Sequence, residues 1–239
     1  MPAPMTQQAS AARDRQILAA AHHLLTSLPY ATISMPRLEA ASGLTSRSIR
    51  RQFPNKAAIF AALTVQEFDR YCQALVTAMV PFRPEPLRQF LIRYATAEPV
   101  FLHLLNALAP NILPALHGRV RQATDRQLTA TIEATATTLD NGVSFFLPGD
   151  GRRFVLLSSR VLAACFDGGS DPTQPALTVT GLQTDPAGAT QFILAAVAGM
   201  RVQATTRQAA RKPDRWGNAW CQKSINAHLV RGQNRVNKK

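Results

Sequence analysis

Signals that start and stop helices lie unusually close together between Ser34 and Lys56, and they leave room only for short helices. Ser34 is a residue type that favours the N-cap of a helix. Pro36 is tolerated in a first turn, because its missing N–H needs no partner there, and Gly43 favours a C-terminal stop. The helix expected over 35–42 is therefore only about two turns long.

A second short helix is predicted in the segment GLTSRSIRRQF, residues 43–53. Thr45 is a good N-cap, and with Thr45 as the cap, Leu44 and Ile49 take the two positions of a hydrophobic staple. Pro54 then forbids continuation of the helix. Two short helices joined by a tight, glycine-containing turn predict a helix-turn-helix unit, whose second helix enters the major groove of DNA.

Longer helices are predicted on both sides of this unit. Over residues 13–28 the apolar side chains recur with the spacing of a helix that buries one face. Asn55 predicts the N-cap of a helix that runs over 56–80 without a breaker. The segment PFRPEP, residues 81–86, predicts the turn that follows.

The rest of the chain also has a helical pattern. No strand-like alternation bounded by hairpin turns is found, so the predicted fold class is all-α, with a three-helix N-terminal helix-turn-helix domain and a larger helical domain. A long Gly-, Pro- and Asp-rich loop is predicted over 167–188. Further helices are predicted over 87–97, 99–108, 119–140, 152–166 and 187–209.

Composition excludes several classes of protein. A chain of 239 residues with 46% hydrophobic residues can bury a sizeable core and is neither disordered nor a membrane protein. The longest apolar stretch, 99–116, contains His103, Asn106 and three prolines, so no membrane span is expected. No leader opens the chain, and the cysteines form no C-x-x-C pair. A cytoplasmic protein is therefore expected.

Positive charge is concentrated at the two ends of the chain. The formal net charge is +13. Residues 1–70 carry 8 basic and 4 acidic side chains, and residues 207–239 carry 9 and 1, whereas residues 71–206 are almost balanced with 10 and 9. A polyanionic partner is therefore expected at the ends of the chain and not at its centre.

The residue types of the helix-turn-helix segment suit contact with DNA. Arg47 can bond a guanine bidentately, and the serines beside it can donate to or accept from base edges. The other basic residues can neutralise phosphates. A solvated basic face is the alternative interpretation, but the caps, the staple and the local charge favour DNA binding. The predicted DNA-binding residues are Ser34, Arg37, Thr45, Ser46, Arg47, Ser48, Arg50, Arg51 and Lys56.

Residues 13–60 resemble the DNA-binding domain of the TetR family of transcriptional repressors. The family's usual wording is close to A-G-V-S-x-G-T-L-Y-x-Y-F-x-S-K, and this chain has ASGLTSRSIRRQFPNK, with Gly43, Phe53 and Lys56 where the family has its glycine, phenylalanine and lysine. The resemblance implies an all-helical homodimer that binds a palindromic double-stranded operator through residues 1–56. Residues 57–210 would then bind a small-molecule effector and form the dimer.

The chain also departs from this pattern. Arg47 stands where the family usually has glycine, and Arg50 and Gln52 stand where it has tyrosines. Glu39 occupies a position usually held by a small alanine that packs on the second helix. It is expected either to pair with Arg37 or Arg47 or to weaken the unit. The operator preference of other family members therefore does not transfer to this chain.

Two sets of residues are predicted for the larger domain. An effector pocket is expected among the helices of 87–166, although core packing is the alternative role of every residue in this set. The resemblance implies that the last two helices pair with their copies in a four-helix dimer interface. The effector set is Tyr94, Phe101, His103, Asn106, His117 and Phe145, and the dimer set is Leu157, Val161, Phe192, Val197 and Met200.

Catalysis has no support in the sequence. His22 and His23 are adjacent and so point about 100° apart on a helix, which does not suit two ligands of one metal. No catalytic or phosphate-cradling motif is present, so neither an enzyme nor a metal or other cofactor is expected. Residues 211–239 predict a disordered basic tail, with added nonspecific DNA affinity as its functional interpretation.

Two hypotheses remain from the sequence. The first is a DNA-binding transcriptional regulator, a repressor that a small-molecule effector releases from a palindromic operator. The second is a helical effector-binding or scaffold protein whose DNA binding is degenerate and nonspecific, which Glu39 and the missing tyrosines would allow.

Overall fold

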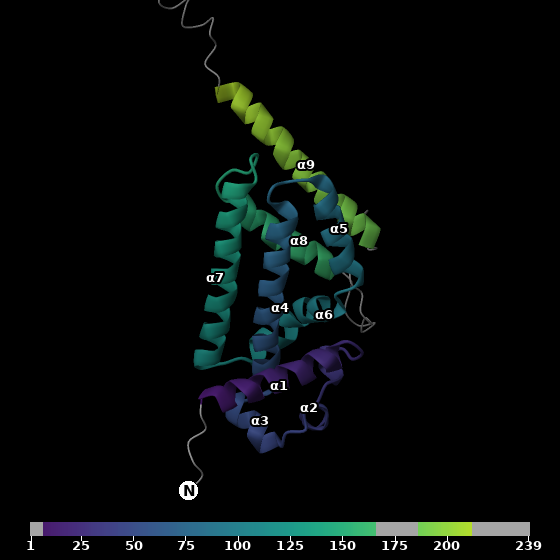
Figure 1. Cartoon of the computed structure of the whole chain (residues 1–239), viewed down its shortest axis with the longest axis vertical. Helices are drawn as coiled ribbons and strands as arrows, with labels where there is room; N and C mark the ends of the chain where they lie inside the picture. The colour runs from purple at the N-terminus through teal and green to yellow at the C-terminus, as the bar shows by residue number, and fades with distance from the viewer. Residues whose placement is uncertain (1–6, 166–185, 212–239) are drawn as a thin grey trace, which may run out of the picture. The chain divides into compact units, whose positions relative to one another are not determined.

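A computed structural model describes residues 7–165 and 186–211, and every regular element within these two ranges is helical (Figure 1). The predicted all-α class is thereby confirmed. The chain divides into two compact units, Met1–Val197 and Ala198–Lys239. The boundary falls within the last described helix, α9 (Pro186–Arg211). The basic tail lies outside the described residues from position 212 on.

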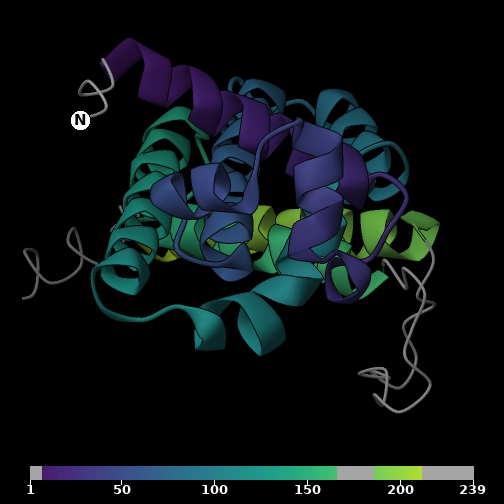
Figure 2. The same ribbon diagram turned by 90° about the horizontal axis from the view of Figure 1, so that it is seen from below.

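Three helices and their connections form the head, the name used below for residues 7–53. They are α1 (Gln7–Leu25), α2 (Met35–Ser42) and α3 (Ser46–Gln52). A single 3-10 turn, η1 (Tyr30–Thr32), lies between α1 and α2. The head occupies the lower end of the molecule in Figure 1 and faces the viewer in Figure 2. Its helix order is that of a helix-turn-helix domain.

The turn between α2 and α3 has the geometry that its residues predict. Gly43 adopts the left-handed conformation with φ 67°, and its N–H donates to the carbonyl of Glu39 at 2.8 Å. Thr45 is the N-cap of α3, and its Oγ1 accepts from the Ser48 N–H at 3.3 Å. Ile49 is fully buried, and Leu44 packs against the same core. Local sequence therefore determines where α2 ends and α3 begins.

The N-cap of α2 is only partly as the sequence predicts. Ser34 occupies the N-cap position, but its hydroxyl accepts no backbone N–H. An N-cap side chain accepts from the second or third helical residue, and the second residue here is Pro36, which has no N–H to donate. The hydroxyl of Ser34 is exposed and is left available for another partner.

Several predicted boundaries were wrong. α1 begins at Gln7 and ends at Leu25, whereas the apolar spacing predicted 13–28. Its end is set by Thr26, whose N–H and hydroxyl both donate to the His23 carbonyl and so close the last turn early. α5 begins at Pro84, inside the predicted turn 81–86, since proline suits a first helical turn.

The loop predicted over 167–188 can be compared only at its end. Residues 186–188 belong to α9, and the remainder lies outside the described residues.

The helices that follow the head form the body of the first unit, together with the start of α9. α4 packs along α7, and α7 packs along α8. Within the described ranges no helix is long and apolar enough to cross a membrane. The bounds are α4 (Lys56–Met79), α5 (Pro84–Thr96), α6 (Pro99–Ala107), α7 (Gly118–Gly142) and α8 (Asp150–Cys165).

The hydrophobic core of the head continues into the body. Ile17 of α1, Leu38 of α2 and Ile49 of α3 belong to one buried cluster that also contains Val100 and Leu104 of α6. Such continuous packing transmits small displacements, because closely packed side chains cannot shift independently. The head is therefore attached to α6 and not only to α4.

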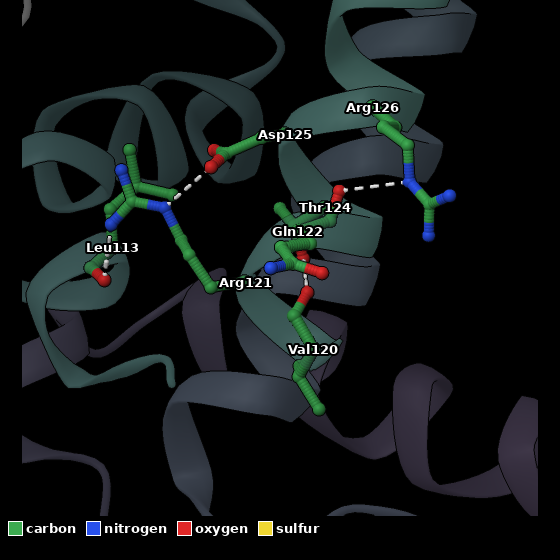
Figure 3. Close-up of polar contacts among 7 residues, drawn as sticks. All are labelled: Leu113, Val120, Arg121, Gln122, Thr124, Asp125 and Arg126. Carbon is green, nitrogen blue, oxygen red and sulfur yellow. Dashed lines mark hydrogen bonds and ion pairs between the residues drawn. The ribbon is translucent and has the colours of Figure 1, made fainter. Parts of the chain in front are cut away.

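The connection from α6 to α7 also contacts the head. It is a π turn, η2 (Leu108–Ile112), followed by a 3-10 turn, η3 (Leu113–Ala115). Asn55, in the turn between α3 and α4, donates from Nδ2 to the Ala115 carbonyl at 3.3 Å. Arg121 of α7 donates to the Leu113 carbonyl at 2.7 Å and to the Asp125 carboxylate at 2.8 Å (Figure 3). These bonds fix the connection against both the head and α7.

Candidate nucleic-acid interface

The arginines of α3 point away from the body. Ile49 is fully buried, and Arg47 and Arg51 lie two residues before and after it, which places them on the opposite side of the helix. Arg50 is also exposed. None of these three arginines forms an ion pair with a described carboxylate. Their positive charge is therefore available to an external anion.

Side-chain hydrogen bonds hold the helix-turn-helix against α1. Ser10 donates to the Gln52 side-chain oxygen at 3.1 Å, which anchors the end of α3. Gln16 donates from Nε2 to the Ser42 carbonyl at 2.7 Å, which anchors the end of α2. Both helices are thus fixed to α1 by polar contacts as well as by the core, and the exposed arginines stand on a rigid support.

Glu39 makes a different contact from the one predicted. It lies in α2, and its Oε1 accepts a hydrogen bond from the hydroxyl of Ser46, in the first turn of α3. Among the described residues it forms no ion pair with Arg37 or Arg47, so the first of the two alternatives predicted from sequence, pairing with an arginine, was wrong. Glu39 is half-buried and instead bridges the two helices of the motif.

Two of the predicted DNA-binding residues, Lys56 and Arg37, already donate hydrogen bonds within the chain. Lys56 donates from Nζ to the Tyr30 and Ile33 carbonyls at 3.0 and 2.9 Å, and it lies 4.0 Å from the centre of the Tyr30 ring. Burial lowers the pKa of its ammonium group. Arg37 donates to the Thr32 carbonyl at 3.0 Å. Two of the three N–H donors of Lys56 are therefore used within the chain.

The remaining predicted residues lie on the turn and on the start of α3. Ser34 is exposed, Ser48 is half-buried, and Thr45 is exposed but uses its oxygen for the cap. The head therefore presents three unpaired arginines together with several hydroxyl groups on one small helix. Guanidinium and hydroxyl groups are donors and acceptors that suit phosphates and the edges of bases in the major groove.

Comparison with known proteins agrees with this geometry. The model of the family described as "Bacterial regulatory proteins, tetR family" matches residues 17–63. The sequence of residues 17–63 is thus similar to that of this family. No curated protein sequence matches the chain.

Two solved structures show that the TetR-type fold extends beyond this domain. A TetR-family transcriptional regulator from Streptomyces coelicolor is 15% identical over 92% of this chain and 98% of its own, with a TM-score of 0.53. A TetR transcriptional regulator from Rhodococcus sp. RHA1 is 18% identical over 80% of this chain and 98% of its own, with a TM-score of 0.51. The chain thus has the fold of TetR-family transcriptional regulators.

The structure brings together only two of the residues predicted to bind an effector. Tyr94 of α5 and Phe101 of α6 are buried, with ring centres 5.4 Å apart. With Tyr71 of α4 and Phe90 of α5 they form what is called here the aromatic cluster. Tyr71 stacks on Phe101 at 4.7 Å, so the rings fill the space between the helices.

The other predicted effector residues differ in exposure and in packing. His117 and Asn106 are exposed, and Phe145 packs against Phe82 and Phe146. His103 is half-buried, and burial lowers the pKa of its imidazole, which favours the neutral form. The role of this set in binding an effector stays a prediction.

A groove of about 480 Å³ lies between α4 and α7. Several of its polar side chains are hydrogen-bonded within the chain: Gln73 donates to Asp69, and Thr135 and Thr138 donate to carbonyls of their own helix. None of the predicted effector residues lines it. The lining residues are Asp69, Cys72, Gln73, Val76, Ala130, Thr131, Ala134, Thr135 and Thr138.

The sequence did not predict the surroundings of the two tyrosine hydroxyls in the aromatic cluster. The Tyr71 hydroxyl lies 2.6 Å from the buried Ser158 hydroxyl of α8. The Tyr94 hydroxyl is buried without a hydrogen-bond partner among the described residues, and burial raises its pKa to about 12. Tyr71 is 87 positions from Ser158 in the chain, so no local pattern could have paired them.

A buried carboxylate lies where the head meets α4. The Glu67 side chain is only 5% exposed, and its oxygens lie 3.7 Å from His22 of α1 and 3.1 Å from Arg70. Burial raises the pKa of Glu67, while the neighbouring positive charges oppose that shift. Helical spacing places Glu67 on the buried face of α4, four residues from Leu63 and from Tyr71, but it does not show that His22 of α1 covers this face.

The predicted dimer residues differ in exposure. Leu157 and Val161 of α8 are half-buried, and Phe192 of α9 is 39% exposed, which is unusual for so large an apolar side chain. Met200 is half-buried and Val197 is buried within the chain. The first three therefore keep apolar surface that a second copy can cover.

Proposed function

We propose that this protein is a non-enzymatic, DNA-binding transcriptional regulator that acts in the cytoplasm as a repressor. It binds a palindromic operator as a homodimer and is released by a small-molecule effector. Two copies present two α3 helices, and a two-fold symmetric dimer reads a two-fold symmetric site.

The observation that carries this proposal is the exposure of Arg47, Arg50 and Arg51 on a short helix whose ends are capped. A solvated basic face needs neither the Thr45 cap nor the bonds that tie α2 and α3 to α1. Arginines on a rigid, outward-facing helix can form bidentate bonds to guanine and charge-assisted bonds to phosphates. A capped helix with unpaired arginines is what a DNA-reading surface requires.

The effector and the dimer have weaker support. The buried, unpartnered Tyr94 hydroxyl favours a ligand at the aromatic cluster, since buried polar groups normally have partners. The core shared by α6 and the head provides a physical route by which a change at this cluster displaces α3. Exposed Phe192 and half-buried Leu157 favour a dimer through α8 and α9.

The test is fluorescence anisotropy with the full chain, a fragment of DNA from upstream of its own gene and a scrambled fragment of equal length. The wild type is expected to bind the upstream fragment at least about a thousandfold more tightly at physiological salt. Arg47→Ala is expected to weaken this binding by about 1–3 kcal/mol if Arg47 reads a base.

Arg83→Ala is the matched control. Arg83 is an exposed arginine without an acidic partner among the described residues, and it follows the far end of α4 from the head. Its removal should leave the binding of both fragments unchanged. Equal affinity of the wild type for both fragments would reject the proposal and favour the degenerate, nonspecific binder.

A further inference from the structure

The hydrogen bond between Ser46 and Glu39 determines which polar groups the start of α3 can offer to DNA. A serine hydroxyl has one proton to donate and two lone pairs that accept. In this structure the proton of Ser46 is directed at the Glu39 carboxylate. An ionised carboxylate cannot donate a proton in return, so the direction of the bond is fixed.

Both groups are therefore acceptors toward any outside partner. The Ser46 oxygen retains lone pairs, and the Glu39 Oε2 atom has no partner among the described residues. Both side chains are half-buried, so part of each remains accessible from outside. The first turn of α3 is the part of a recognition helix that approaches base edges.

The edges of the four bases differ in what they present to such acceptors. In the major groove adenine and cytosine each carry an amino group that donates, whereas guanine and thymine present oxygen atoms that accept. Because the Ser46 oxygen and the Glu39 carboxylate can both only accept, they bond the amino groups of adenine and cytosine and repel the oxygen atoms of guanine and thymine. A serine without the neighbouring carboxylate accepts or donates equally well and does not make this distinction.

We propose that Glu39 is a specificity-determining residue, which makes Ser46 an acceptor and thereby selects adenine or cytosine at one position of each operator half-site. This inference rests on the proposed function. Glu39 acts through Ser46 and is in that sense a positioning residue. Its negative charge, beside the arginines of α3, also opposes indiscriminate contact with phosphates.

The test is selection of binding sites from a pool of random DNA by the full-length protein. The wild type is expected to enrich a palindrome that has adenine or cytosine at one position of each half-site, by about fivefold or more over guanine and thymine. Ser46→Ala should abolish the preference at that position and leave the rest of the palindrome unchanged.

Two substitutions of Glu39 separate the proposed role from simple packing. Glu39→Ala removes the carboxylate to which Ser46 donates, so the Ser46 hydroxyl becomes free to donate to a base. Guanine and thymine should then be bound as well as adenine and cytosine at the same position. Glu39→Gln keeps the size of the side chain but replaces one acceptor oxygen with an NH2 group that can donate, so it should also relax the preference, whereas a role in packing alone would leave the preference unchanged. Glu85→Ala, which removes an equal charge from the exposed surface of α5, is the control and should change nothing.

The outcomes are distinct. If the wild type enriches a palindrome and Glu39→Ala enriches the same bases at every position, Glu39 does not determine specificity and the inference is overturned. A change by Glu39→Ala at a position different from that affected by Ser46→Ala overturns it as well. If the wild type enriches no sequence, the proposed function itself fails and this inference fails with it.

Discussion

The head and the aromatic cluster of the body place their polar groups in opposite ways. In the head, the arginines of α3 are exposed and unpaired, while the helix beneath them is capped and fully packed. In the cluster, Tyr71 and Tyr94 are buried, and only one of their two hydroxyls has a partner. A surface that binds a large anion can be complete before its partner arrives, whereas a buried site for a small molecule must open to admit one.

This difference leads to separate expectations for stability and for DNA binding. Substitutions in the cluster should change chiefly the free energy of unfolding, and should reach DNA affinity only through the core that α6 shares with the head. Substitutions of the exposed arginines should lower DNA affinity directly and leave the free energy of unfolding unaltered.

The largest effect on stability is expected for Phe101→Ala. Phe101 is 2% exposed and stacks on Tyr71, so its truncation loses ring contacts and leaves a cavity. The free energy of unfolding, measured with urea, should fall by about 3–5 kcal/mol. Arg83→Ala should change it by less than about 0.5 kcal/mol. A loss below about 1 kcal/mol for Phe101→Ala would mean that the cluster is loosely packed and already open.

A smaller loss of stability is expected when an N-cap side chain of the head is removed. Thr45→Ala removes the oxygen that accepts from Ser48 and should destabilise the protein by about 1 kcal/mol in thermal or urea unfolding. Ser34→Ala is the matched control, because Ser34 occupies an N-cap position without a side-chain bond, and it should have almost no effect. Equal losses for the two variants would show that the Thr45 bond does not stabilise α3.

The two tyrosines of the cluster allow a comparison that removes a single oxygen. Tyr71→Phe loses the bond to Ser158 and should cost about 1 kcal/mol in urea unfolding. Tyr94→Phe removes a buried hydroxyl that has no partner and should be neutral or stabilising. A loss of stability for Tyr94→Phe equal to that for Tyr71→Phe would show that the Tyr94 hydroxyl is bonded in solution.

The smallest effect concerns the pH dependence of stability at the junction between the head and α4. Burial raises the pKa of Glu67 above the ordinary value of 4.5, while Arg70 and His22 oppose that shift. Because the folded protein then holds the proton more tightly than the unfolded chain, this contribution to stability is complete below pH 4.5 and is lost as pH rises through the folded pKa.

Glu67→Gln should remove this part of the pH dependence. Urea unfolding of the wild type and the variant between about pH 4 and 7 measures the difference. Identical pH profiles for the two proteins would mean that Glu67 titrates normally.

The sequence predicted the head better than the body, for physical reasons. Gly43, Thr45 and Asn55 act on atoms within a few positions of themselves, so their effects can be inferred from spacing alone. The contact between Ser46 and Glu39 spans 7 positions across a turn and depends on how two helices pack. The sequence therefore identified Glu39 as unusual but suggested the wrong partner.

The effector residues were chosen from apolar and aromatic spacing, which also describes ordinary core. Tyr94 and Phe101 meet because α5 and α6 both pack on α4, and this is a property of tertiary structure. Phe145 is of the same residue type as Phe101, yet it packs against Phe82 and Phe146. Periodicity identifies which face of a helix is buried but not which other helix covers it.

Hydroxyl-radical footprinting of the wild-type protein on its own upstream DNA tests the central claim most directly. If two α3 helices read a palindromic operator, two protected segments should lie on one face of the duplex, about 10 base pairs or a multiple of that apart. Their centres should coincide with two inverted half-sites, and Arg47→Ala should weaken both segments together. Uniform protection along the whole fragment, or protection of a single segment, would contradict the account.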